Sequence, residues 1–129
     1  MDEVAHKTTR ILIADDHAMF IDGIKSLLRK FDKAEIVAEA HDGQEALELL
    51  KEGGIDMLIT DINMPRLDGF GLIERLRAGN RHHDRPILVL TTESSDEKKQ
   101  RARNAGATGW IVKPFDADKL TAALRRVIH

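Results

Sequence analysis

Five residues able to bind metal ions or phosphate each follow an apolar segment of the chain, at the point where that segment ends. Asp15 and Asp16 follow the first segment, Asp61 follows another, and Thr91 and Lys113 close two later ones. Because ligands bind beside the carboxyl ends of the strands in a parallel sheet, these side chains are expected to meet at one edge. Three carboxylates, a hydroxyl and an ammonium group there would form a site for a divalent cation and a phosphoryl group.

The alternation of apolar and amphipathic segments predicts the elements that position these residues. Strands are expected at residues 10–15, 35–40, 55–60, 86–91 and 108–112, each followed by a helix. Helical spacing runs from Phe20 to Phe31, Asp42 and Glu45 form a capping box, and Gly79 and Gly106 end the third and fourth helices. Asp116 is expected to cap the last helix. Five strand–helix units predict an α/β fold, a single doubly wound parallel sheet.

Composition limits the domain count and the classes of function. The 129 residues make one domain, expected at residues 10–129 after a flexible tail at residues 1–9. With 20 basic and 22 acidic residues the net charge is −2, which does not favour direct binding to nucleic acid or to a membrane surface. The chain has no cysteine, no apolar run of membrane-spanning length and no secretory signal, so a cytoplasmic location is expected.

The expected helix at residues 95–105 differs from the others because it has little to bury. Only Ala102 and Ala105 are apolar there, whereas each large aliphatic side chain buried elsewhere contributes about 1.5–3 kcal/mol. This helix is therefore predicted to be the most loosely anchored element and the one most easily moved.

The three aspartates allow two interpretations. Each could cap the next helix, which is the simpler explanation for any one of them taken alone. Three acids at adjacent strand ends repel one another, however, and favour a bound cation such as Mg²⁺, which prefers oxygen ligands. His17 follows the acid pair; it could tune the cation site, although its position favours a role at the start of a helix.

Asp61 is also a candidate nucleophile, because carboxylates form acyl phosphates. Lys113 and a cation would offset the charge of the transferring group, and Thr91 could donate its hydroxyl to a phosphoryl oxygen. Taken alone, Thr91 would be an ordinary strand-end residue and Lys113 an ordinary surface lysine.

These motifs together resemble the response-regulator receiver domains of two-component signalling. The resemblance rests on Asp15-Asp16, on residues 61–69 (Asp-Ile-Asn-Met-Pro-Arg-Leu-Asp-Gly), on residues 90–92 (Leu-Thr-Thr) and on residues 109–115 (Gly-Trp-Ile-Val-Lys-Pro-Phe). It implies a flavodoxin-like or CheY-like (βα)5 fold with strand order 2-1-3-4-5. Residues 90–115 are most similar to the chemotaxis receivers of the CheY type, and residues 11–28 are more similar to receivers of the NarL/FixJ transcription-factor group.

The resemblance implies a role for each matching residue. Asp61 would be the phosphoacceptor, and Asp15 and Asp16 would hold Mg²⁺ or Mn²⁺ together with Asp61 and the backbone carbonyl of Asn63. Thr91 and Lys113 would contact the phosphoryl group.

Further matching positions imply switching and tuning. Trp110 stands where a smaller aromatic residue commonly rotates when the threonine moves. Asn63 and Glu93 would tune access of the hydrolytic water and give a short-lived phosphorylated state. The charge that phosphorylation adds beside Thr91 and Lys113 would shift the helix at residues 95–105 and the residues that pack beneath Trp110.

The expected function is that of a stand-alone receiver, a phosphoacceptor switch with self-catalysed phosphorylation and dephosphorylation rather than an enzyme. A histidine kinase or a histidine phosphotransfer protein would supply the phosphoryl group. A downstream target would bind the face formed by the helix at 95–105, the strand at 108–112 and the final helix, with chemotaxis as one expected setting. The protein is expected to be a monomer, with a dimer on phosphorylation paired through Asp96, Glu97, Asp118 and nearby arginines.

Three alternatives belong to other classes. The chain could be the receiver half of a NarL/FixJ-type DNA-binding regulator without its effector domain. A haloacid-dehalogenase-type phosphohydrolase is disfavoured, since Asn63 stands where that class needs a second acid. A domain that binds partners through an acidic pocket without phosphorylation is the last alternative.

Overall fold

Ten elements alternate strictly along the chain in the computed structural model, which describes residues 8–29, 31, 33–79, 85–92, 94–113 and 117–127. The strands are β1 (Thr9–Ala14), β2 (Ala34–Ala40), β3 (Met57–Thr60), β4 (Ile87–Thr91) and β5 (Gly109–Val112). The helices are α1 (Ala18–Leu28), α2 (Gly43–Lys51), α3 (Gly69–Ala78), α4 (Asp96–Ala105) and α5 (Ala117–Val127). The predicted alternation is thus confirmed.

The five strands form one parallel sheet in the order β2-β1-β3-β4-β5, as predicted. The order in which strands are added to the sheet reverses between β1 and β3: β2 lies on one side of β1, whereas β3, β4 and β5 follow on the other. This is the topological switch point at which α/β sheets bind their ligands. Ala14 pairs with Thr60 there, so Asp15 and Asp61 leave neighbouring strands at the same level.

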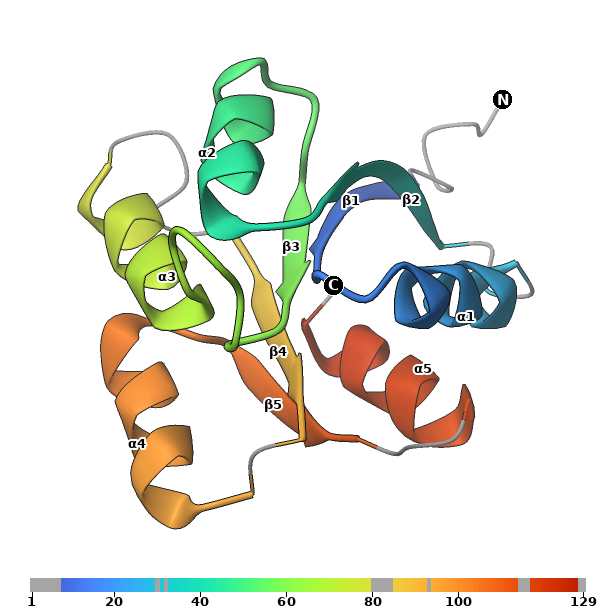
Figure 1. Ribbon diagram of the computed structural model, residues 1–129. Helices are drawn as coiled ribbons and strands as arrows, with labels where there is room; N and C mark the ends of the chain where they lie inside the picture. Colours follow the sequence, from blue (N-terminus) through green and yellow to red (C-terminus); the bar gives the residue numbers. More distant parts are fainter. Residues whose placement is uncertain are drawn as a thin grey trace.

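Helices cover both faces of the sheet, and each face has its own core. Figure 1 shows α2, α3 and α4 on one side and α1 and α5 on the other. Side chains alternate along β1: Leu12 and Ala14 belong to the cluster under α2, α3 and α4, while Ile11 and Ile13 belong to the cluster under α1 and α5. Strands buried on both faces explain why the sequence shows continuous apolar runs.

Side-chain caps set the starts of three helices. Asp42, Asp68 and Ser95 each accept a hydrogen bond from the backbone N–H three residues further on, at α2, α3 and α4. In the predicted capping box, Glu45 reaches back to the N–H of His41, one residue before the cap. Gly106 ends α4 with φ of 118°, a left-handed conformation that glycine adopts without steric cost.

The predicted strands begin within one or two residues of the observed ones, and α1 ends earlier than predicted. β1 begins at Thr9, one residue earlier than predicted, and residues 1–7 of the predicted tail lie outside the described residues. Phe31 lies beyond the end of α1, but it is buried and its N–H donates to the Leu28 carbonyl. Asp116, the predicted cap of the last helix, is outside the described residues. Among the described residues, no helix combines the length and the hydropathy that crossing a lipid bilayer requires.

Of the two alanines expected to be buried in α4, Ala102 is buried and Ala105 is half-buried, so the helix has little to bury, as predicted. Two contacts from α3 supplement this anchor. The Arg101 guanidinium lies 4.1 Å from the centre of the Phe70 ring, and the Arg77 side chain donates to the Gly106 carbonyl after α4. An arginine–ring contact of this kind contributes about 0.5–1 kcal/mol at an exposed site, so α4 is held weakly.

Candidate functional site

Asp15 and Asp61 lie side by side because their strands pair. The Asp61 N–H donates to the carbonyl of Ala14 (3.0 Å), and the Asp15 N–H donates to the carbonyl of Ala40 (3.0 Å). Both residues are buried, with relative accessibilities of 0% and 6%. A buried carboxylate without a compensating charge is unfavourable, so the partners of this pair decide what the site can bind.

Lys113 is the cation that reaches both buried acids. Its Nζ lies 3.0 Å from Asp15 Oδ2 and 3.5 Å from Asp61 Oδ2. Its backbone N–H donates to the Thr91 carbonyl (2.7 Å), so the end of β5 is joined to the end of β4. The ammonium also lies 3.7 Å from the centre of the Phe20 ring of α1. Sequence reasoning missed this ring contact, because Phe20 fits the apolar pattern of a helix.

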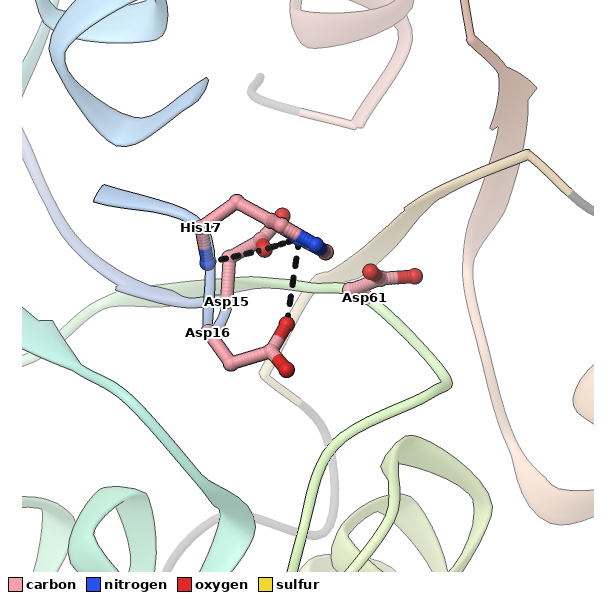
Figure 2. A group of neighbouring side chains, drawn as sticks. All are labelled: Asp15, Asp16, His17 and Asp61. Atoms are coloured by element: carbon pink, nitrogen blue, oxygen red, sulfur yellow. Dashed lines mark hydrogen bonds and ion pairs between the residues drawn. The ribbon is translucent and has the colours of Figure 1, made fainter. Parts of the chain in front are cut away.

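Asp16 and His17 complete the cluster from the turn before α1. The His17 Nδ1 lies 3.0 Å from Asp15 Oδ1 and 3.1 Å from Asp16 Oδ1, and the His17 N–H donates to Asp15 Oδ1 (2.9 Å). Figure 2 shows the imidazole reaching toward both carboxylates, with Asp61 beside them. The sequence favoured a helix-start role for His17; the structure places it at the N-cap of α1, with its side chain directed to the acids.

The donor set fits a divalent cation. Asp15, Asp16, His17 and Asp61 each offer one ligand atom, and all four atoms lie within 4.8 Å of one another. Lys113 balances one of three carboxylate charges, which leaves an excess of negative charge at a partly buried place. Hard oxygen donors with water access on the Asp16 side are the surroundings that Mg²⁺ prefers.

The loop after β3 is fixed by its own backbone. Ile62 N–H donates to Asp61 Oδ1 (2.7 Å), and Gly69 N–H donates to the Ile62 carbonyl (2.8 Å). A Cβ at Gly69 would lie 2.4 Å from the Asp61 carbonyl oxygen, so only glycine fits this position. The loop therefore holds the Asp61 carboxylate in one orientation.

A second contact fixes the same loop to α2. The Arg66 Nε donates to Asp42 Oδ2 (2.9 Å), and Arg66 has φ of 68°, the only positive φ of a non-glycine residue in the described ranges. Hydrogen bonding by the Glu45 N–H, and then the Arg66 guanidinium, lower the pKa of the Asp42 carboxyl. Gly43 N–H also donates to the Leu67 carbonyl (3.0 Å). Nothing in the sequence pattern predicted the Asp42–Arg66 pair, whose members are 24 residues apart.

The remaining predicted residues lie at different distances from the cluster. Thr91 is fully buried at the end of β4, at the same edge of the sheet. Asn63 is exposed on the loop after β3. Trp110 is half-buried on β5 and, with Ala102 and Arg103, lines a hollow of about 240 Å³ between α4 and β5. Glu93 lies outside the described residues.

A parallel sheet with acids at the ends of β1 and β3 and a lysine after β5 defines a class of signalling domain. The chain belongs to the response regulator receiver domain family, whose model matches residues 11–125. The chain is therefore related to the proteins of two-component signalling, as the sequence motifs indicated.

Similar proteins include chemotaxis proteins and the receiver domain of a NarL-type regulator. The chain is 37% identical to the chemotaxis protein CheY-3 of Vibrio cholerae, over 100% of this chain and 98% of that protein. The solved structure of the chemotaxis response regulator CheY4 of Vibrio cholerae matches with a TM-score of 0.86 at 37% identity, covering 95% of this chain and 100% of that one. The receiver domain of NarL from Mycobacterium tuberculosis matches with a TM-score of 0.83 at 25% identity, covering 93% and 95%.

Proposed function

We propose that this receiver is a phosphoacceptor switch in which Asp61 takes a phosphoryl group from the phosphohistidine of a histidine kinase or a histidine phosphotransfer protein. The observation that carries the proposal is the Asp61 carboxylate, buried beside Asp15 and 3.5 Å from the Lys113 ammonium. Membership of the receiver family and similarity to CheY-type proteins support it. Such a protein is a switch that modifies itself, not an enzyme acting on a separate substrate.

The two oxygens of Asp61 have different surroundings. Oδ1 accepts the Ile62 N–H, which leaves Oδ2, on the Lys113 side, as the nucleophile. Attack on phosphorus forms the acyl phosphate and breaks the P–N bond, whose electron pair stays on the imidazole nitrogen and takes up a proton. Lys113 then offsets the added negative charge, and the Thr91 hydroxyl donates to a phosphoryl oxygen.

Asp15, Asp16, Asp61 and the backbone carbonyl of Asn63 would hold the divalent cation, Mg²⁺ or Mn²⁺. When bound, such a cation neutralises the carboxylates and the phosphoryl oxygens and orients them for transfer. Without it, three carboxylates face an incoming dianion with one ammonium to balance them, so phosphorylation is expected to depend on the metal.

Switching follows from the positions of Thr91 and Lys113. Their backbones are hydrogen bonded, so a phosphoryl group that attracts both side chains acts on the ends of β4 and β5 together. The weakly held α4 follows β4, and Trp110 lines the hollow between α4 and β5. The face formed by α4, β5 and α5 would then bind a downstream target, in chemotaxis or a related pathway, while Asn63 and Glu93 set the lifetime of the phosphorylated state.

Intact-protein mass spectrometry after incubation with acetyl phosphate tests the proposal. A single phosphoryl adduct should form on the wild type with Mg²⁺. No adduct should form on the Asp61→Asn variant, or on the wild type in the presence of EDTA. An adduct that persists in Asp61→Asn, or its absence from the wild type, would refute the proposal.

A second candidate is the receiver half of a DNA-binding regulator, which the structural match to the NarL receiver favours. The mass of the endogenous protein from its host separates the two functions: the mass of 129 residues supports the stand-alone receiver, and a larger one supports the regulator. The dimer of the phosphorylated form stays a prediction, for which light scattering with beryllofluoride is the measurement.

A further inference from the structure

The imidazole of His17 makes no capping hydrogen bond to the helix that it precedes. His17 is the N-cap of α1, yet its side chain accepts no hydrogen bond from the first turn, whereas the capping side chains of α2, α3 and α4 all do. Its Nδ1 instead lies near Asp15 Oδ1 and Asp16 Oδ1, at 3.0 and 3.1 Å. The His17 side chain is 66% exposed, so this orientation does not result from burial in the core.

These spacings match the coordination shell of a metal ion. Metal–ligand bonds of about 2.1 Å at right angles place neighbouring ligands about 3.0 Å apart and opposite ligands about 4.2 Å apart. The Nδ1 is 3.0 and 3.1 Å from the two carboxylate oxygens, and the set that includes Asp61 lies within 4.8 Å. One ion can therefore contact the nitrogen and the carboxylates together with small adjustments of side chains.

We propose that His17 is a direct ligand of the cation at the Asp15–Asp16–Asp61 cluster, and that its nitrogen makes the site prefer ions that bind imidazole well, such as Ni²⁺, to Mg²⁺. This inference rests on the proposed function for the presence of a cation, and it adds a nitrogen donor and a selectivity to an all-oxygen site. Imidazole suits nickel, zinc, copper and iron, whereas Mg²⁺ favours carboxylate, carbonyl and water. The neutral ring would coordinate through Nδ1 and keep its proton on Nε2.

The structure offers a clean variant and a matched control. His17→Ala removes the imidazole but keeps the backbone N–H that donates to Asp15 Oδ1, so the carboxylate keeps that support. His41 is the control, because its Nδ1 lies 3.3 Å from the single carboxylate of Glu45 and its side chain is 57% exposed, similar to His17.

Isothermal titration calorimetry with Ni²⁺ and with Mg²⁺ on the wild type and both variants tests the assignment. Loss of a supporting contact to a metal ligand costs roughly 10–100-fold in affinity, so loss of a direct ligand should weaken Ni²⁺ binding at least about tenfold. Mg²⁺ binding should change less than about twofold in His17→Ala, and His41→Ala should match the wild type for both ions. Excess Mg²⁺ should displace the Ni²⁺, and pulsed electron paramagnetic resonance of bound Mn²⁺ should show nitrogen coupling that His17→Ala abolishes.

Equal weakening of Ni²⁺ and Mg²⁺ in His17→Ala would overturn the inference, since it would mean that the imidazole only positions the carboxylates. Unchanged Ni²⁺ binding, or Ni²⁺ that excess Mg²⁺ does not displace, would also overturn it. In those cases a wild type that binds Mg²⁺ and gains a phosphoryl group on Asp61 leaves the proposed function standing. Failure of the wild type to bind Mg²⁺ or gain the adduct is a separate result that refutes the proposed function.

Discussion

Replacing Asp61 by asparagine should stabilise the metal-free protein, because the carboxylate is held in place against unfavourable electrostatics. The asparagine side chain has nearly the same shape, and its oxygen can still accept the Ile62 N–H that binds Asp61 Oδ1. Lys113 keeps its closer partner, Asp15, at 3.0 Å. The substitution therefore removes one negative charge and the longer of the two Lys113 contacts, that with Asp61 Oδ2 at 3.5 Å.

The magnitude follows from the distances. With an effective dielectric constant of about 20, the attraction between Asp61 and Lys113 at 3.5 Å is about 4.7 kcal/mol. Repulsion from Asp15, at no more than 4.8 Å, is at least about 3.5 kcal/mol, and that from Asp16 is roughly half as large because its exposed side chain is screened by water. Repulsion thus slightly exceeds attraction, and the desolvation of a buried carboxylate adds to the cost. We expect Asp61→Asn to raise the free energy of unfolding by about 1–3 kcal/mol.

Urea denaturation in EDTA and in saturating Mg²⁺, followed by the fluorescence of the single tryptophan, Trp110, is the assay. In EDTA the variant should be the more stable protein. Mg²⁺ at 100 times its dissociation constant adds about 2.7 kcal/mol to the wild type, so the difference should vanish or reverse. Asp68→Asn is the control, because asparagine caps helices as well as aspartate does and Asp68 is exposed outside the cluster.

A variant less stable than the wild type in EDTA would refute this reasoning, since it would show that Lys113 more than balances the acids. A stabilisation that Mg²⁺ leaves unchanged would also refute it, because the repulsion that the cation removes could not then be its source.

Three further predictions concern the elements that surround the site. Gly69→Ala should lower the free energy of unfolding by about 1–3 kcal/mol in chemical denaturation, since its Cβ would meet the loop backbone, while Gly23→Ala, with open space around it, should be neutral or stabilising. The lowered pKa of Asp42 means that its ion pair and cap stabilise the protein above the unfolded carboxyl pKa of about 3.9 and lose that effect as pH falls through the lower folded value. Acid titration of stability should therefore be flatter below about pH 4 in Asp42→Asn, and a parallel curve would contradict the assignment. Hydrogen exchange should be faster in α4 than in α3, and Arg101→Gln, which removes the contact with Phe70, should speed it further in α4 alone.

The fold could be predicted from the sequence because the spacing of apolar residues agrees, along the whole chain, with the positions of the residues that begin and end helices and strands. Strands buried on both faces produced continuous apolar runs, and Asp42 of the predicted capping box caps α2. The caps at Asp68 and Ser95 were not predicted. Boundaries were harder to predict: Phe31 continues the helical spacing but lies past the end of α1, because burial rather than helical periodicity determines its place.

The acids and the lysine of the site were predictable because parallel strands end at one edge. Particular side-chain contacts between elements far apart in the chain were not predictable, because no local sequence pattern indicates them. Phe20 against Lys113 and Arg66 against Asp42 join separate elements through side-chain geometry alone. For His17 the sequence placed the residue but not the direction of its ring, which depends on the turn that brings Asp15 and Asp16 to the same side.

The sheet divides the apolar interior into two clusters that meet only through the strands. Leu12 and Ile13 are adjacent in sequence, yet each packs with a different set of helices. Since coupling between substitutions requires contact or shared partners, changes in the two clusters should have additive effects on stability. A damaging substitution can then be compensated only from its own side of the sheet. During divergence of related receivers, compensating pairs of core substitutions should therefore accumulate within a cluster and not across it.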